Sequence, residues 1–127
     1  LMSAATYNLF IDQGSDFAID LVIKENGSGM DLTNYQGRGQ LRSSHTSSTI
    51  AGYFKVTKTD QVNGTIKVEI PNGSWLDTSV SPPVQRSGST DISAGQYVYD
   101  LEIFTTADAV VKRLMQGTAT INPEVTR

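Results

Sequence analysis

Apolar and polar side chains alternate along most of this chain, which is the pattern of β-strands that bury one face. The clearest case is the segment 16–23, where Phe17, Ile19, Leu21 and Ile23 share one face. The same alternation recurs in the segments 7–12, 35–42, 50–56, 66–70, 97–104 and 110–121. Turn residues separate these segments every 8–12 residues or so, which is typical of two packed antiparallel sheets. The pattern therefore predicts about seven short strands and no long helix.

The segment 94–104, AGQYVYDLEIF, adds a more specific signal. Asp91 precedes Gly95, and Tyr97 follows two residues later at the start of an alternating strand. This order resembles the entry to strand F of an immunoglobulin-like sandwich, where a tyrosine hydroxyl bonds back to the preceding corner. We therefore expect a single all-β domain over 1–127, an immunoglobulin-like antiparallel β-sandwich of about seven strands. At most one short helical turn is expected, at 75–77.

Three local features complete the expected fold. The segment 81–93 is rich in Pro, Ser and Gly without an apolar period, which predicts a long exposed loop. Gly37 and Gly39 fall on the inward face of their strand, so we expect Trp75 to cover the space that they leave. Gly117 is a candidate β-bulge in the last strand.

Composition excludes several classes of function. The chain has no cysteine and one histidine, so thiolate and multi-histidine metal sites are excluded. Its 10 basic residues are scattered against 13 acidic ones, which argues against nucleic-acid binding. No apolar run approaches the roughly 20 residues of a membrane helix. Residues 1–5 carry no leader pattern, and we expect them to be disordered or a remnant of cloning.

No set of side chains predicts catalysis, a metal or another cofactor. His45 lies in a serine-rich polar segment, where nothing orients its imidazole. Asp16 and Asp20 point outward about 13 Å apart along a strand, too far to share one calcium ion. Asp100 and Glu102 lie about 7 Å apart on one face, within the range of glycosidase pairs. Exposed acids of this kind more often pair with arginine or lysine, so we expect a protein that is not an enzyme.

The candidate contacts with a partner are few. Tyr53 and Phe104 lie on the faces opposite the main apolar sets of their strands. Pro82, Pro83 and Arg86 lie in the expected loop, and a long loop in a small domain often makes contacts. These five residues are the predicted contact residues.

Four segments resemble small structural proteins from the virion modules of tailed bacteriophages: YNLFIDQGSDF (7–17), DLTNYQGRGQLR (31–42), AGQYVYDLEI (94–103) and RLMQGTATINPEVTR (113–127). The resemblance implies an immunoglobulin-like module that docks on other virion subunits near the tail, baseplate or fibre attachment. It would be located in the virion, assembled in the host cytoplasm, and a homo-oligomer is an open alternative. The last strand, over 114–121, would offer an edge for pairing with a neighbour. A carbohydrate- or receptor-binding module on the same architecture is the alternative function.

Overall fold

A computed structural model describes residues 5–106 and 109–125 of the chain. The described residues form one large sheet and two short ribbons, with the strand order β1-β12-β11-β6-β7-β8-β3 in the large sheet and β2 also paired with β12. The strands are β1 (Ala5–Thr6), β2 (Leu9–Asp12), β3 (Phe17–Val22), β4 (Lys24–Glu25), β5 (Ser28–Gly29), β6 (Gln36–Arg42), β7 (Gly52–Asp60), β8 (Thr65–Ile70), β9 (Trp75–Asp77), β10 (Val84–Arg86), β11 (Gly95–Phe104) and β12 (Val111–Asn122).

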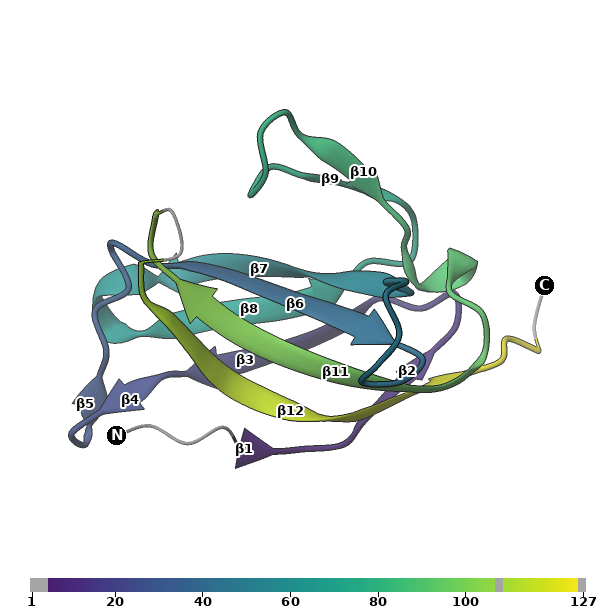
Figure 1. The fold of residues 1–127 in the computed structure, drawn as a ribbon, viewed down its shortest axis with the longest axis horizontal. Coiled ribbons are helices and arrows are strands. Elements are labelled where there is room, and N and C mark those ends of the chain that lie inside the picture. Colours follow the sequence, from purple (N-terminus) through teal and green to yellow (C-terminus); the bar gives the residue numbers. More distant parts are fainter. Residues whose placement is uncertain (1–4, 107–108, 126–127) are drawn as a thin grey trace.

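The large sheet curls over itself at β7 to make the two layers of a sandwich (Figure 1). Residues 52–54 of β7 pair with β6, and residues 55–60 pair with β8. One layer therefore holds β2, β12, β11 and β6, and the other holds β3 and β8, with β7 shared between them. The fold is all-β, a sandwich of two sheet layers, as the alternating pattern predicted.

The core lies between these two layers and is built from the period-two apolar sets. Every second residue of β8 is buried, namely Ile66, Val68 and Ile70. In the opposite layer, β11 buries Tyr99, Leu101 and Ile103 in the same way. Other members of the core are Leu9, Ile11, Leu41, Phe54, Met115, Ala119 and Ile121. Successive side chains of a strand point to opposite faces, so the alternating apolar residues of each strand are all buried on one face.

The prediction that residues 114–121 form a free strand edge is wrong, because the N-terminal strands cover that edge. β1 and β2 both run parallel to β12, so this strand is not free to add to a neighbour's sheet. The β-bulge of β12 is at Leu114 and not at Gly117, because the register with β11 shifts at Leu114. Instead, Gly117 has φ near +153° and leaves room for the backbone of Tyr7, which a Cβ would strike. The Tyr99 hydroxyl donates to the Tyr7 carbonyl at 2.6 Å, and burial, with a smaller effect of Tyr7, raises the pKa of Tyr99 to about 12.

The corner before β11 closes through a tyrosine. The Tyr97 hydroxyl donates a hydrogen bond to the Ser93 carbonyl at 2.6 Å, four residues earlier. Gly95 opens the strand with φ near +151°, a conformation that favours glycine. Asp91 is exposed at the end of a short 3₁₀ turn, so the bond at this corner is made to the main chain.

The segment expected to be one helical turn is a strand instead. Residues Trp75–Asp77 form β9, and the described 3₁₀ turns lie elsewhere, at Gln61–Asn63 and Ser89–Asp91. The space beside Gly37 and Gly39 is also filled differently. A Cβ at Gly37 would meet Val56, and one at Gly39 would meet Phe54. Side chains of the adjacent strand β7 therefore occupy the space that we assigned to the indole.

The segment 81–93 is not one long exposed loop. Val84–Arg86 form β10 and pair with β9, so the first half is one arm of a hairpin. In the second half, Ser89 and Ile92 are buried. The Ser89 hydroxyl donates to the carbonyl of Ser15 at 2.5 Å, and its N–H donates to the carbonyl of Pro71 at 2.8 Å. Only residues 81–85 and 87 of the first half are well exposed. The composition of the segment could not predict this ordered structure, because the buried contacts join segments far apart in the chain.

Candidate docking site at the β9–β10 hairpin

The β9–β10 hairpin projects from the sandwich above β6 and β7 (Figure 1). Its register places Trp75 opposite Arg86 and Asp77 opposite Val84. Trp75 is 9% exposed and Asp77 is also buried, whereas Leu76 between them is 50% exposed. The alternation of β9 therefore gives the hairpin an inner side, toward the sheet, and an outer side, toward solvent.

Arg86 links the two arms of the hairpin and fastens them to the sheet. Its Nε lies 3.0 Å from Oδ2 of Asp77, and the two side chains are only 15% and 10% exposed. Its guanidinium carbon also lies 3.7 Å from the ring centre of Tyr53 in β7. A guanidinium can form an ion pair and stack on an aromatic face at the same time because it is planar. One side chain thus fixes the position of the hairpin.

Asp77 is the polar centre of the inner side. It accepts hydrogen bonds from the backbone N–H of Ser79 at 3.0 Å and from the Ser79 hydroxyl at 2.5 Å, as well as from Arg86. Burial raises the pKa of Asp77, but the hydrogen bonds from Ser79 and Arg86 together outweigh it and leave the pKa below its ordinary value. The carboxylate is therefore ionised at neutral pH and satisfied by its own hairpin.

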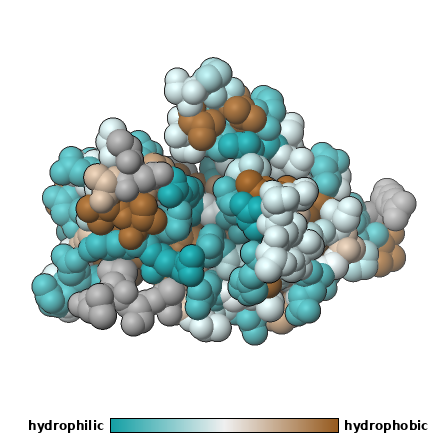
Figure 2. Space-filling model, in the orientation of Figure 1, coloured by the Kyte–Doolittle hydropathy of each residue, from teal (hydrophilic) through white to brown (hydrophobic). Residues whose placement is uncertain are grey.

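Exposed apolar side chains lie on both sides of the hairpin and at its tip. Leu76 points to the outer side, whereas Val84, opposite Asp77, shares the inner side. Val80, Pro82 and Pro83 are exposed at the tip. Figure 2 shows apolar side chains on this projecting part of the molecule. We call these five residues the exposed hairpin surface. Two of the predicted contact residues, Pro82 and Pro83, thus lie where a partner can reach them.

A groove of about 320 Å³ separates the inner side of the hairpin from the sheet. Its basic lining residues are Arg38, Lys55 and Lys58, and Asp77 is the acidic one. The aromatic lining comes from Tyr53, Phe54 and Trp75. The polar remainder consists of Gln36, Thr57, Gln61, Thr78 and Ser79.

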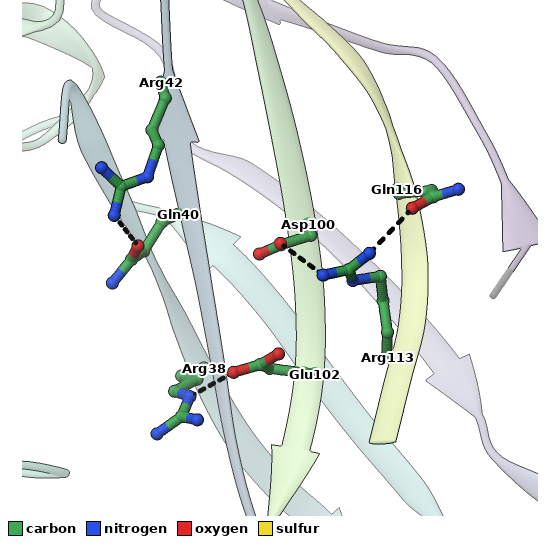
Figure 3. Close-up of polar contacts among 7 residues, drawn as sticks. All are labelled: Arg38, Gln40, Arg42, Asp100, Glu102, Arg113 and Gln116. Atoms are coloured by element: carbon green, nitrogen blue, oxygen red, sulfur yellow. Dashed lines mark hydrogen bonds and ion pairs between the residues drawn. The ribbon is translucent and has the colours of Figure 1, made fainter. Parts of the chain in front are cut away.

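The face of β6, β11 and β12 beside this groove carries crossed ion pairs (Figure 3). Arg38 lies 2.5 Å from Glu102, and Arg113 lies 3.6 Å from Asp100. The acids that could have suggested a glycosidase therefore pair with arginines, as expected from the sequence. The guanidinium of Arg38 also lies 4.1 Å from the ring centre of Phe104. Phe104, one of the predicted contact residues, is therefore half-buried beneath a cation. The face continues with Gln40 bonded to Arg42 and Gln116 bonded to Arg113.

The remaining candidates for chemistry lie apart from one another. His45 is exposed and lines a depression of about 190 Å³ together with Asp100, without a hydrogen bond to any described residue. Asp16 accepts the backbone N–H of Asn72 at 2.8 Å. Within residues 5–106 and 109–125, no three His, Asp or Glu side chains are placed to hold a metal ion. A search of the same residues found no helix long and apolar enough to cross a membrane.

Sequence reasoning missed the hairpin, although one signal pointed to it. Pro82 and Pro83 lie between β9 and the short segment ending at Arg86, where a turn is expected. No pattern in the sequence predicts the ion pair between Asp77 and Arg86.

No model of a protein family matches the chain. A search of curated proteins also gave no match. Among solved structures, the chain is similar to an extracellular domain of the voltage-gated sodium channel beta4 subunit, described as forming parallel homodimers in cell–cell adhesion. That match has a TM-score of 0.42 and 11% identity over 98% of each chain.

Proposed function

We propose that this protein is a non-catalytic recognition module, a structural or adaptor protein of a tailed-phage virion that docks on other virion subunits. The exposed hairpin surface is the docking element. The resemblance of four segments to virion proteins supports the setting, and the hairpin supports the mode of action. Location in the virion and assembly in the host cytoplasm belong to the same proposal.

The observation that carries the proposal is an apolar surface held rigidly away from the body. Single exposed apolar side chains are normal on any protein. Here Leu76, Val80 and Val84 share one hairpin that Arg86 fastens to Tyr53. A preordered element loses little conformational entropy on binding, so more of its contact energy contributes to affinity.

Carbohydrate binding is the second candidate, favoured by one observation. Phe10 in β2 is 70% exposed and Tyr7 is exposed beside it, so aromatic rings face solvent there. The other rings are poorly placed for stacking on a sugar. Arg86 covers Tyr53, and Trp75 is buried. A glycan array, with Phe10→Ala as the matched variant, tests this candidate directly.

The docking proposal is tested with the proteins encoded by neighbouring reading frames. Each is purified and titrated against this chain by interferometry, and light scattering detects a second copy of the chain as the partner. We expect one of these proteins to bind, and the double variant Leu76→Ser, Val84→Ser to weaken that binding at least about tenfold. Val62→Ser, at another exposed valine, is the matched control and should bind normally. Equal binding by the double variant would refute docking through the hairpin.

A further inference from the structure

The groove under the hairpin lies where two neighbouring strands separate. β6 and β7 pair only between 39–41 and 52–54. Beyond that point β7 turns to β8, with Lys55 opposite Glu69, while Gln36–Arg38 of β6 pair with β11 alone. The described strands therefore leave one edge of β6 without a strand partner at Gln36 and Gly37. An unpaired edge of this kind can accept an extended peptide through main-chain hydrogen bonds.

A buried donor in the same groove lacks an acceptor. Trp75 lines the groove, and its Nε1–H is buried without a hydrogen-bond partner among the described residues. A buried N–H of tryptophan ordinarily finds a partner, because an unpaired donor loses its hydrogen bonds to water without replacement. The geometry therefore favours an oxygen acceptor supplied by a bound molecule.

The charges of the lining favour an anionic acceptor. Lys55 has no ion-pair partner among the described residues, and Lys58 donates to the carbonyls of Leu32 and Thr33 at 3.3 and 3.5 Å. Asp77 is already neutralised by Arg86 and bonded by Ser79. The unmatched charge in the groove is thus positive, although the whole chain carries a net charge of −3.

We propose that this groove binds an extended acidic segment of the protein partner. The segment adds to the edge of β6 at Gln36 and Gly37, and one of its side-chain carboxylates accepts from Trp75 Nε1–H and pairs with Lys55. The proposal rests on the docking function above and specifies the chemistry of the partner. A sugar fits less well, because the Tyr53 ring is covered and the indole of Trp75 is buried.

Trp75 is the only tryptophan, so its indole N–H gives a single, readily assigned NMR signal. The probe is a capped hexapeptide of alternating valine and glutamate, titrated into the ¹⁵N-labelled protein. A peptide with glutamine in place of glutamate is the neutral control, and acetate is the free-carboxylate control. We expect the acidic peptide to shift the indole signal downfield and to shift the amide signals of Gln36 and Gly37. The glutamine peptide should bind about tenfold more weakly or not at all.

Two variants locate the contact. Lys55→Gln should weaken binding of the acidic peptide about tenfold and abolish its preference over the glutamine peptide. Lys24→Gln, an exposed lysine in β4, is the matched control and should change nothing. Trp75→Phe removes the donor and keeps a ring, and Lys55→Gln remains informative if that variant folds poorly. An unmoved indole signal at millimolar peptide, equal binding of both peptides, or an equal response to acetate would each overturn the proposal.

The two proposals fail in different ways. If the virion partner binds the Lys55→Gln variant normally but not the Leu76→Ser, Val84→Ser variant, docking stands and the acidic-segment proposal falls. If no partner binds but the acidic peptide does, the groove is a peptide site and the docking function falls.

Discussion

Replacing Arg86 with alanine should release the hairpin from the sandwich. The substitution removes the charged hydrogen bond to Asp77 at 3.0 Å and the stacking on Tyr53 at 3.7 Å. Asp77 keeps its two bonds from Ser79 but loses its cation in a site where it is only 10% exposed. The hairpin itself has three paired residues on each strand, and an isolated hairpin is marginal in water.

The size of the effect follows from these two contacts. A hydrogen bond to a charged group contributes about 1.5–3 kcal/mol. A cation over an aromatic face contributes about 0.5–2 kcal/mol. Because both side chains of the ion pair are largely buried, screening by water reduces these values little. The expected loss in docking free energy is therefore about 2–5 kcal/mol, enough to undock a marginal element while the main core stays folded.

Tryptophan fluorescence measures this release, since Trp75 is the only tryptophan and lies on the inner side of the hairpin. We expect a red-shifted emission and faster quenching by acrylamide in Arg86→Ala, with an unchanged far-UV spectrum. Arg113→Ala is the matched control, because Arg113 and Asp100 are 53% and 42% exposed and 3.6 Å apart. That exposed pair should contribute less than about 1 kcal/mol and leave the emission unchanged.

The same fluorescence can refute the reasoning. If the emission and quenching of Arg86→Ala match those of the unmodified protein, Arg86 does not hold the hairpin. If Arg113→Ala exposes Trp75 to the same degree, the effect comes from general destabilisation and not from the contacts of Arg86.

Three other predictions concern separate parts of the chain. The pKa of Asp77 is lowered in the folded state, so the ionised carboxylate stabilises the hairpin fully above the ordinary aspartate pKa of about 4, and this stabilisation is lost as pH falls through the folded pKa. Trp75 emission should therefore shift to the red as pH falls, and Asp77→Asn should abolish this pH dependence. Gly117→Ala forces a Cβ against the Tyr7 carbonyl at positive φ, so the free energy of unfolding from chemical denaturation should fall by about 1–3 kcal/mol, and amide exchange in β1 should become faster. An unchanged free energy of unfolding would contradict the close approach of Gly117 to Tyr7. Tyr97→Phe removes the bond to the main chain before β11 and should cost about 1 kcal/mol in the same measurement, whereas a neutral result would mean that water replaces the bond.

Much of the sandwich could be predicted from alternation alone. The inward set of β11 and the inward set of β8 are the residues that the period-two pattern selected. The pattern failed where burial does not follow a strand. Ser89 is buried by a hydrogen bond to Ser15, 74 residues earlier, and no local feature of its Ser- and Gly-rich segment reveals this.

The candidate site was predicted only in part. Pro82, Pro83, Arg86 and Tyr53 were selected as contact residues, and the structure places them all at the hairpin or beneath it. The contact between Arg86 and Tyr53 could not be predicted, because the two residues are far apart in the chain; Pro82 and Pro83 stay exposed.

The sequence by itself determined which faces of the strands are buried, because each strand fits the core in only one of its two orientations. It also determined what chemistry is missing, since a chain without cysteine and with one histidine cannot build thiolate or multi-histidine sites. Only the tertiary structure decided that β12 is covered by the N-terminal strands and that β6 and β7 separate under the hairpin. These features depend on pairing between distant segments, and the free energy of such pairing comes from contacts that neither segment can specify alone.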